Sequence, residues 1–122
     1  MRVLRIDDDA LVRLLLRDTL AAEGIEVDGL ANAEDALVLL GAGQVPDVLV
    51  ADIDLGPGLS GLDLAAIARE RHPGAEVVLI SGSAPDPGQP ALGRRERFLR
   101  KPFAPAALAE AIRGAATMAK VG

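Results

Sequence analysis

The apolar positions of the chain switch between a spacing typical of strands and a spacing typical of helices. Strand-like runs span residues 3–6, 25–30, 47–52, 77–80 and 97–100. Helical spacing covers residues 9–23, 32–41, 60–72 and the segment from Pro105 through Met118. Strands that alternate with helices predict a parallel sheet with helices on both faces and right-handed crossovers. The pattern therefore predicts a doubly wound (βα)₅ domain of the α/β class.

The first expected helix has clear start and stop signals. Asp9 can cap its start and Gly24 its end, so Asp9 is interpreted as a capping residue rather than a metal ligand. One face of this helix would carry Leu11, Leu14, Leu15, Thr19 and Ala22. The inner face expected for the next helix consists of Ala33, Ala36, Leu37 and Leu40.

The strands and the remaining helix differ in how strongly the sequence supports them. Residues 47–52 are apolar without alternation, which is typical of a central parallel strand covered on both faces. Residues 25–30 alternate between apolar and polar, as an edge strand does. Residues 84–93 contain three prolines and two glycines, so we expect the fourth helix to be short, displaced or missing.

Length, charge and composition narrow the function. The 122 residues suit one domain, expected to span residues 1–122, and the net charge of −5 argues against nucleic acid and anionic membranes as partners. The absence of cysteine excludes disulfides, zinc–thiolate sites and cysteine catalysis. No apolar run reaches the roughly 18 residues of a membrane span. We therefore expect a cytoplasmic protein.

Acidic side chains follow two of the expected central strands. Asp7, Asp8 and Asp9 end the first strand, and Asp52 and Asp54 end the third. In an open parallel sheet, ligands bind outside the carboxyl ends of the strands. Converging carboxylates repel one another and favour a hard divalent cation such as Mg²⁺. We expect Asp7 and Asp8 to hold the metal and Asp52 to act as the nucleophile, forming an acyl phosphate.

The other two strand ends offer groups that suit a phosphoryl ligand. The fourth strand ends in Ser81, whose hydroxyl can donate a hydrogen bond, and the fifth ends in Lys101. Eleven of the thirteen basic residues are arginine, so a lysine at this place stands out. Its compact ammonium supplies a point charge that can neutralise a phosphoryl oxygen.

At this point the chain resembles the response-regulator receiver family over essentially its whole length. The resemblance rests on residues 6–9, 46–52, 81–82 and 98–103, four short motifs in order at strand ends. It implies a flavodoxin-like sheet order of 2-1-3-4-5. It also implies that Asp52 accepts a phosphoryl group from a phosphohistidine on a sensor histidine kinase or phosphotransfer protein, and that the domain then switches binding to a downstream protein.

The resemblance implies further residue roles. Mg²⁺, or Mn²⁺ in its place, would be held by Asp7, Asp8, Asp52 and the backbone carbonyl of Asp54. Lys101 would pair with the phosphoryl group, Ser81 would hydrogen-bond it, and the rotamer of Phe98 would follow the Ser81 shift. Asp54 and Ser83 would tune hydrolysis of the acyl phosphate.

Three features depart from the family pattern. The loop between Asp52 and Gly61 carries one extra residue, around Gly56, Pro57 and Gly58. The segment of the fourth helix, part of the usual output face, is interrupted by prolines. Arg5 stands where the first strand is normally apolar, so its side chain either snorkels toward a sheet edge or pairs with an acid.

Two other functions compete with a phosphate-accepting receiver, which would not be a turnover enzyme. A pseudo-receiver would only bind partners, although such domains typically lose the acceptor or a metal ligand, and this chain keeps both. Residues 52–55 also resemble the DxDx signature of haloacid-dehalogenase-like phosphatases, but that family carries the motif on an early strand. The chain contains no P-loop and no GxGxxG motif after a strand.

Overall fold

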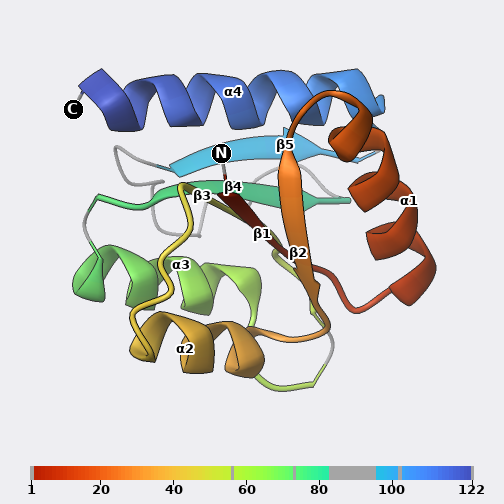
Figure 1. Cartoon of the computed structure of the whole chain (residues 1–122). Helices are drawn as coiled ribbons and strands as arrows, with labels where there is room; N and C mark the ends of the chain where they lie inside the picture. The colour runs from red at the N-terminus through yellow and green to blue at the C-terminus, as the bar shows by residue number, and fades with distance from the viewer. Residues whose placement is uncertain (1, 56, 73, 83–95, 102, 122) are drawn as a thin grey trace.

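The computed structural model describes residues 2–55, 57–72, 74–82, 96–101 and 103–121 (Figure 1). Its elements are β1 (Arg2–Ile6), α1 (Ala10–Ala22), β2 (Glu26–Leu30), α2 (Ala33–Gly41), β3 (Val48–Asp52), α3 (Gly61–Arg71), β4 (Glu76–Ser81), β5 (Glu96–Arg100) and α4 (Pro105–Val121). The expected fourth helix, at residues 84–93, lies outside the described residues. The helix labelled α4 is the last one predicted from the sequence.

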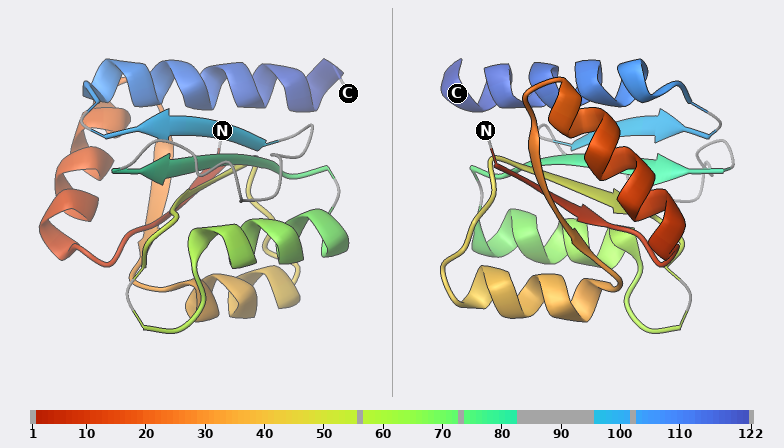
Figure 2. Two further views of the ribbon diagram at one scale, coloured as in Figure 1. Left: turned by 180° about the vertical axis from the view of Figure 1, so that it is seen from behind. Right: turned by 45° about the vertical axis from the view of Figure 1, so that its right-hand side comes forward.

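The five strands form one parallel sheet in the order β2-β1-β3-β4-β5, which confirms the predicted topology. Helices α1 and α4 cover one face of the sheet, and α2 and α3 cover the other (Figures 1 and 2). Because the strands are parallel, all their carboxyl ends lie along one edge of the sheet. That edge is where the acidic residues of β1 and β3 meet.

Two apolar layers hold the helices to the sheet. Alternate side chains of the strands pack against α1 and α4 on one face and against α2 and α3 on the other. All five residues of β3 are buried, as the continuous apolar run predicted. In β2 the buried Val27 lies between the exposed Glu26 and Asp28, which confirms an edge strand. The central position of β3 places Asp52 at the middle of the carboxyl edge.

Helix α1 packs through a different face from the one predicted. Leu11, Leu14 and Leu15 are 64%, 48% and 57% exposed, whereas Leu16 and Leu20 are buried against the sheet and α4. Apolar residues occur nearly all around this helix, so the spacing alone is compatible with more than one face. Packing selects a face about a third of a turn away from the predicted one. The inner face predicted for α2 is confirmed, with Ala33, Ala36 and Leu40 buried.

Polar side chains cap the starts of α1 and α3. The side chain of Asp9 accepts hydrogen bonds from the backbone N–H groups of Leu11 (3.0 Å) and Val12 (3.2 Å), which confirms the cap. Ser60 and Asp63 form a reciprocal capping box at the start of α3.

Among the described residues, no helix combines the length and apolar character needed to cross a membrane.

Candidate functional site

The structure brings three predicted acids together at the carboxyl edge of the sheet. Ile6 of β1 pairs with Ala51 of β3, so the next residues, Asp7 just after β1 and Asp52 at the end of β3, lie at the ends of neighbouring strands. One carboxylate oxygen from each of Asp7, Asp8 and Asp52 lies within 4.8 Å of the other two. Asp7 and Asp52 are buried, whereas Asp8 is exposed. The cluster therefore has a buried base and one side open to solvent.

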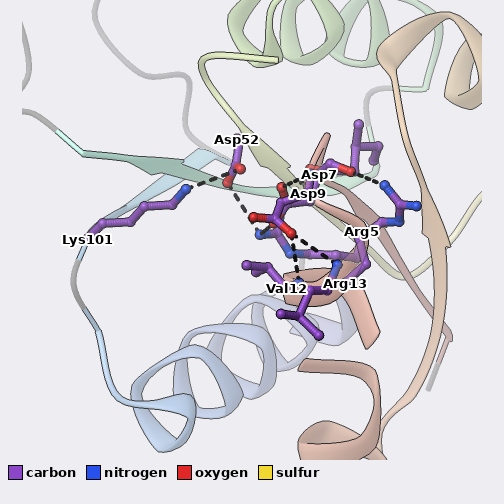
Figure 3. A network of polar contacts seen from close by, with 9 residues as sticks. Arg5, Asp7, Asp9, Val12, Arg13, Asp52 and Lys101 are labelled. Carbon is purple, nitrogen blue, oxygen red and sulfur yellow. Dashed lines mark hydrogen bonds and ion pairs between the residues drawn. The ribbon is translucent and has the colours of Figure 1, made fainter. Parts of the chain in front are cut away.

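The start of α1 fixes the orientation of Asp7. Its Oδ1 atom accepts a hydrogen bond of 2.9 Å from the backbone N–H of Asp9. The guanidinium of Arg13 donates to the backbone carbonyl of Asp7 at 2.6 Å (Figure 3). The acidic turn after β1 is thus held from the same helix that Asp9 caps.

Arg5 lies beneath the acidic cluster and pairs with it. Its Nη2 atom donates to Asp7 Oδ2 at 2.7 Å and to Asp52 Oδ1 at 3.3 Å (Figure 3). Its Nη1 atom donates to the backbone carbonyl of Ile6 at 2.8 Å. The whole side chain is buried, so the pairing alternative is confirmed and snorkelling toward a sheet edge is wrong.

Lys101 approaches Asp52 from the opposite side. Its Nζ atom lies 3.3 Å from Asp52 Oδ2, and its side chain remains 44% exposed (Figure 3). The backbone N–H of Lys101 donates to the carbonyl of Ser81 at 2.8 Å, which ties the end of β5 to the end of β4. Each carboxylate oxygen of Asp52 therefore faces a different cation.

Burial dominates the electrostatics of Asp52. Loss of contact with water raises the pKa of the Asp52 carboxyl above its ordinary value. The positive charge of Arg5 lowers that pKa, the negative charge of Asp7 raises it, and Lys101 lowers it by charge and by hydrogen bonding. The pKa remains raised because the two cations do not fully offset desolvation and the neighbouring acid.

The other predicted site residues lie around this centre. Ser81 ends β4 and follows Ile80, the register partner of Asp52. Phe98 lies in β5 opposite Leu79 and is half-buried. Asp54 is exposed, two residues beyond Asp52. Ser83 lies outside the described residues.

The loop between β3 and α3 is anchored by residues that the sequence analysis missed. Glu34 Oε1 accepts a hydrogen bond of 3.0 Å from the backbone N–H of Leu59, and this bond lowers the pKa of Glu34. The N–H of Gly61 donates to the carbonyl of Ile53 at 2.9 Å. A Cβ atom at Gly61 would overlap the carbonyl oxygen of Asp52 and lie 2.7 Å from its carbonyl carbon. Only a glycine lets α3 begin this close to Asp52. The sequence signal that could have identified this role is the position of Gly61 directly after the capping residue Ser60.

The donor set suits a hard divalent cation. Asp7, Asp8 and Asp52 offer only oxygen ligands, which Mg²⁺ prefers, and the exposed Asp8 leaves a route from solvent. Arg5 already engages one oxygen each of Asp7 and Asp52, so a cation would share these carboxylates with a buried guanidinium. The three carboxylates therefore fit a divalent metal ion. The guanidinium of Arg5 is a positive charge that competes with such an ion for the same oxygens.

Comparison with known proteins identifies the family. The profile of the response regulator receiver domain matches residues 3–113. The chain is 36% identical over 116 residues to the C4-dicarboxylate transport transcriptional regulatory protein DctD of Pseudomonas aeruginosa, covering 93% of this chain and 25% of that protein. It is 30% identical over 118 residues to the chemotaxis protein CheY of Thermotoga maritima, covering 91% of this chain and 93% of CheY. The chain belongs to the response regulator receiver domain family.

Solved structures support the same assignment. A response regulator receiver protein from Sinorhizobium medicae WSM419 superposes with a TM-score of 0.83 at 28% identity, covering 98% of this chain and 96% of that one. The chain spans only a quarter of DctD. Receiver domains are signalling modules of two-component systems that interact with histidine kinases and downstream effectors.

Proposed function

We propose that residues 1–122 form a single cytoplasmic receiver domain that accepts a phosphoryl group on Asp52. The donor would be a phosphohistidine on a sensor histidine kinase or a phosphotransfer protein. The observation that carries the proposal is the position of Asp52, buried at the carboxyl edge of the central strand with Lys101 Nζ 3.3 Å from its carboxylate. Membership of the receiver family supports the same chemistry.

The transfer would form one bond and break another. A carboxylate oxygen of Asp52 attacks the phosphorus, and the bond between phosphorus and the histidine nitrogen breaks. The imidazole keeps the electron pair, and the product is an acyl phosphate on Asp52. Such transfers need mainly positioning and charge neutralisation, which the ammonium of Lys101 and the hydroxyl of Ser81 can supply to the phosphoryl oxygens.

The metal ligands in this proposal are Asp7, Asp8, Asp52 and the backbone carbonyl of Asp54. When bound, Mg²⁺, or Mn²⁺ in its place, supplies positive charge that offsets the negative charge of the phosphoryl group. The chain's own part is to hold Asp7 rigidly. The N–H of Asp9 and the guanidinium of Arg13 do this from the start of α1.

The output of the domain would be a change in partner binding rather than catalytic turnover. Ser81 would move toward the phosphoryl group, and Phe98, on the neighbouring strand, would change rotamer in response. A downstream protein would read this change. Asp54 and Ser83 would set how long the acyl phosphate lasts.

The test is phosphorylation by a small phosphodonor, acetyl phosphate, with MgCl₂ and with EDTA, followed by intact-protein mass spectrometry. We expect one added phosphoryl group that hydroxylamine removes, as it does from acyl phosphates. Asp52→Asn should abolish incorporation, because the amide cannot attack. Asp47→Asn is the matched control, since Asp47 lies before the opposite end of β3 and accepts only the backbone N–H of Arg2 among the described contacts. Equal incorporation in Asp52→Asn and wild type would refute the proposal.

A pseudo-receiver remains a second candidate because of one observation. Arg5 already neutralises part of the acidic cluster, an arrangement that a domain without metal chemistry could also use. Titration with beryllofluoride and Mg²⁺, followed by NMR, separates the two functions. Shifts around Asp52 that require Mg²⁺ support the phosphate-accepting receiver, and their absence supports the pseudo-receiver. Membership of the receiver family leaves the phosphatase alternative without support.

A further inference from the structure

The largest side chain that is fully buried in the described part of the chain is an arginine in a strand of the sheet core. Arg5 is 1% exposed and lies between Asp7 and Asp52, two residues of the candidate metal site. A buried charge is costly unless it is paired, so the position requires an electrostatic reason. The two carboxylates supply that reason, because a single Nη2 atom contacts both.

We propose that Arg5 is an internal counter-cation that keeps the acidic site folded without metal and weakens its affinity for Mg²⁺. The inference rests on the metal site of the proposed function. In this chain, the side chain of Arg5 supplies part of the positive charge that the acidic site requires. The domain would then fill with metal only at a higher Mg²⁺ concentration than the same site without Arg5.

The charges of the cluster support this role. Asp7, Asp8 and Asp52 carry three negative charges, and Arg5 and Lys101 carry two positive charges, which leaves a net charge of −1. Replacing Arg5 by a neutral residue would leave a net charge of −2. The difference acts at short range in a buried region, where solvent and salt screen poorly. A divalent cation is therefore attracted less strongly while Arg5 is present.

The chemistry of the guanidinium makes the effect permanent. Arginine stays protonated at any ordinary pH, so Arg5 cannot lose its charge when a metal arrives. Its Nη1 atom is held by the carbonyl of Ile6, while its Nε atom is buried without a hydrogen-bond partner among the described residues. Arg5 thus makes one contact with the backbone and two with carboxylates, so Asp7 and Asp52 supply most of its pairing.

A second arginine near the cluster shows the difference. Arg13 donates to the backbone carbonyl of Asp7, and no described contact joins it to a carboxylate of the cluster. Arg13 therefore holds the turn, whereas Arg5 engages the same oxygens that a metal would use.

Calorimetric titration with MgCl₂ tests the affinity. Arg5→Met and Arg5→Gln remove the charge and keep much of the volume, and we expect each to bind Mg²⁺ at least about tenfold more tightly than wild type. Arg5→Lys keeps the charge and should stay within about threefold of wild type. Arg2→Met removes a charge from the exposed end of the same strand and should also stay within about threefold, because distant exposed charges are screened.

Thermal unfolding with and without metal gives an independent readout. In EDTA, Arg5→Met and Arg5→Gln should unfold at lower temperature than wild type, and MgCl₂ should raise their melting temperature more than that of wild type. A variant that is unfolded in EDTA and folds when MgCl₂ is added gives the same support. If Arg5→Met does not fold under either condition, Arg5→Gln and Arg5→Lys decide the question, because only Arg5→Gln is expected to bind Mg²⁺ more tightly than wild type.

The outcomes separate this inference from the proposed function. Equal Mg²⁺ affinity in wild type and both neutral variants would overturn the role of Arg5, while Mg²⁺-dependent phosphorylation of Asp52 would leave the proposed function intact. Absence of Mg²⁺ binding from every variant, together with absence of phosphorylation in wild type, would overturn both.

Discussion

The two ends of strand β1 place the same residue types in very different surroundings. At the amino end, the Nε atom of Arg2 lies 3.5 Å from Asp28 Oδ2, with the two side chains 41% and 58% exposed. Three residues later, Arg5 lies 2.7 Å from Asp7 Oδ2, and both side chains are almost fully buried. One pair is solvated and the other is part of the protein interior.

This difference shows that the contribution of an ion pair to stability depends on how far the pair is exposed to water. Exposed pairs contribute little, because water screens the charges and two flexible side chains must be ordered. Buried partners depend on each other, because removal of one leaves the other desolvated and uncompensated. The exposed pair at the amino end of β1 can therefore lose a charge with little consequence, whereas the buried pairs at its carboxyl end cannot.

The largest expected effect tests this contrast directly. Arg5→Ala should lower the free energy of unfolding by about 3–5 kcal/mol in EDTA, because it leaves buried carboxylates unpaired. Arg2→Ala should lower it by less than about 1 kcal/mol. Urea unfolding of both variants measures the difference. Equal losses would show that burial does not distinguish the two arginines.

A similar contrast between neighbouring residues sharpens the function of the carboxyl edge. Lys101→Ala should slow phosphorylation of Asp52 by about a hundredfold, because it removes the cation that faces the carboxylate. Arg100→Ala removes an adjacent exposed charge and should change the rate by less than about twofold. Rates with acetyl phosphate decide the matter. A similar loss in both variants would point to general attraction of the donor rather than to a role of Lys101.

The raised pKa of Asp52 predicts a dependence of stability on pH. Burial favours the protonated carboxyl in the folded state, so the ionised form reduces stability once the pH rises through the folded pKa. Asp52→Asn should therefore be more stable than wild type near pH 7, with Asp7 still paired to Arg5. The advantage should disappear toward about pH 3, where wild type is protonated both folded and unfolded. Urea unfolding across this range, in EDTA, would contradict the assignment if the advantage grew as the pH fell.

The smallest expected effect concerns the rim of the site. Asp54→Ala should leave the phosphorylation rate of Asp52 unchanged and alter the decay rate of the acyl phosphate by a few-fold, as exposed charges contribute under about 1 kcal/mol. Loss of phosphate after removal of the donor measures this decay. An unchanged decay rate would remove Asp54 from the hydrolysis step and leave only its backbone carbonyl in the proposal.

The sequence predicted the sheet because the relevant signals are local. Buried strands such as β3 read as continuous apolar runs, and the caps at Asp9 and Ser60 are short-range patterns with fixed hydrogen-bonding geometry. The prediction of the packing face of α1 was wrong because apolar residues occur around most of that helix. There the choice between Leu15 and Leu16 as the inward residue depends on α4, more than eighty residues further along the chain.

The sequence predicted which residues form the site but did not predict the contacts that Arg5 makes within it. Placing Asp7, Asp52 and Lys101 at strand ends was enough to bring them together, because parallel strands end at one edge. The reach of Arg5 into that cluster depends on side-chain direction and on the register of β1 with β3. Residue identity alone left two alternatives for Arg5, and only the three-dimensional arrangement chose between them.

Gly61 shows how this domain could lose its activity without the change of a single acid or base. A methyl group at this position would press on the peptide unit of Asp52 and displace the acceptor or the first turn of α3. A survey of natural variants that inspects only the aspartates, the serine and the lysine would count such a protein as competent. Receiver domains that cannot be phosphorylated should therefore also occur among chains that keep every ionisable site residue. In such chains, a larger residue would replace the glycine that follows the α3 cap.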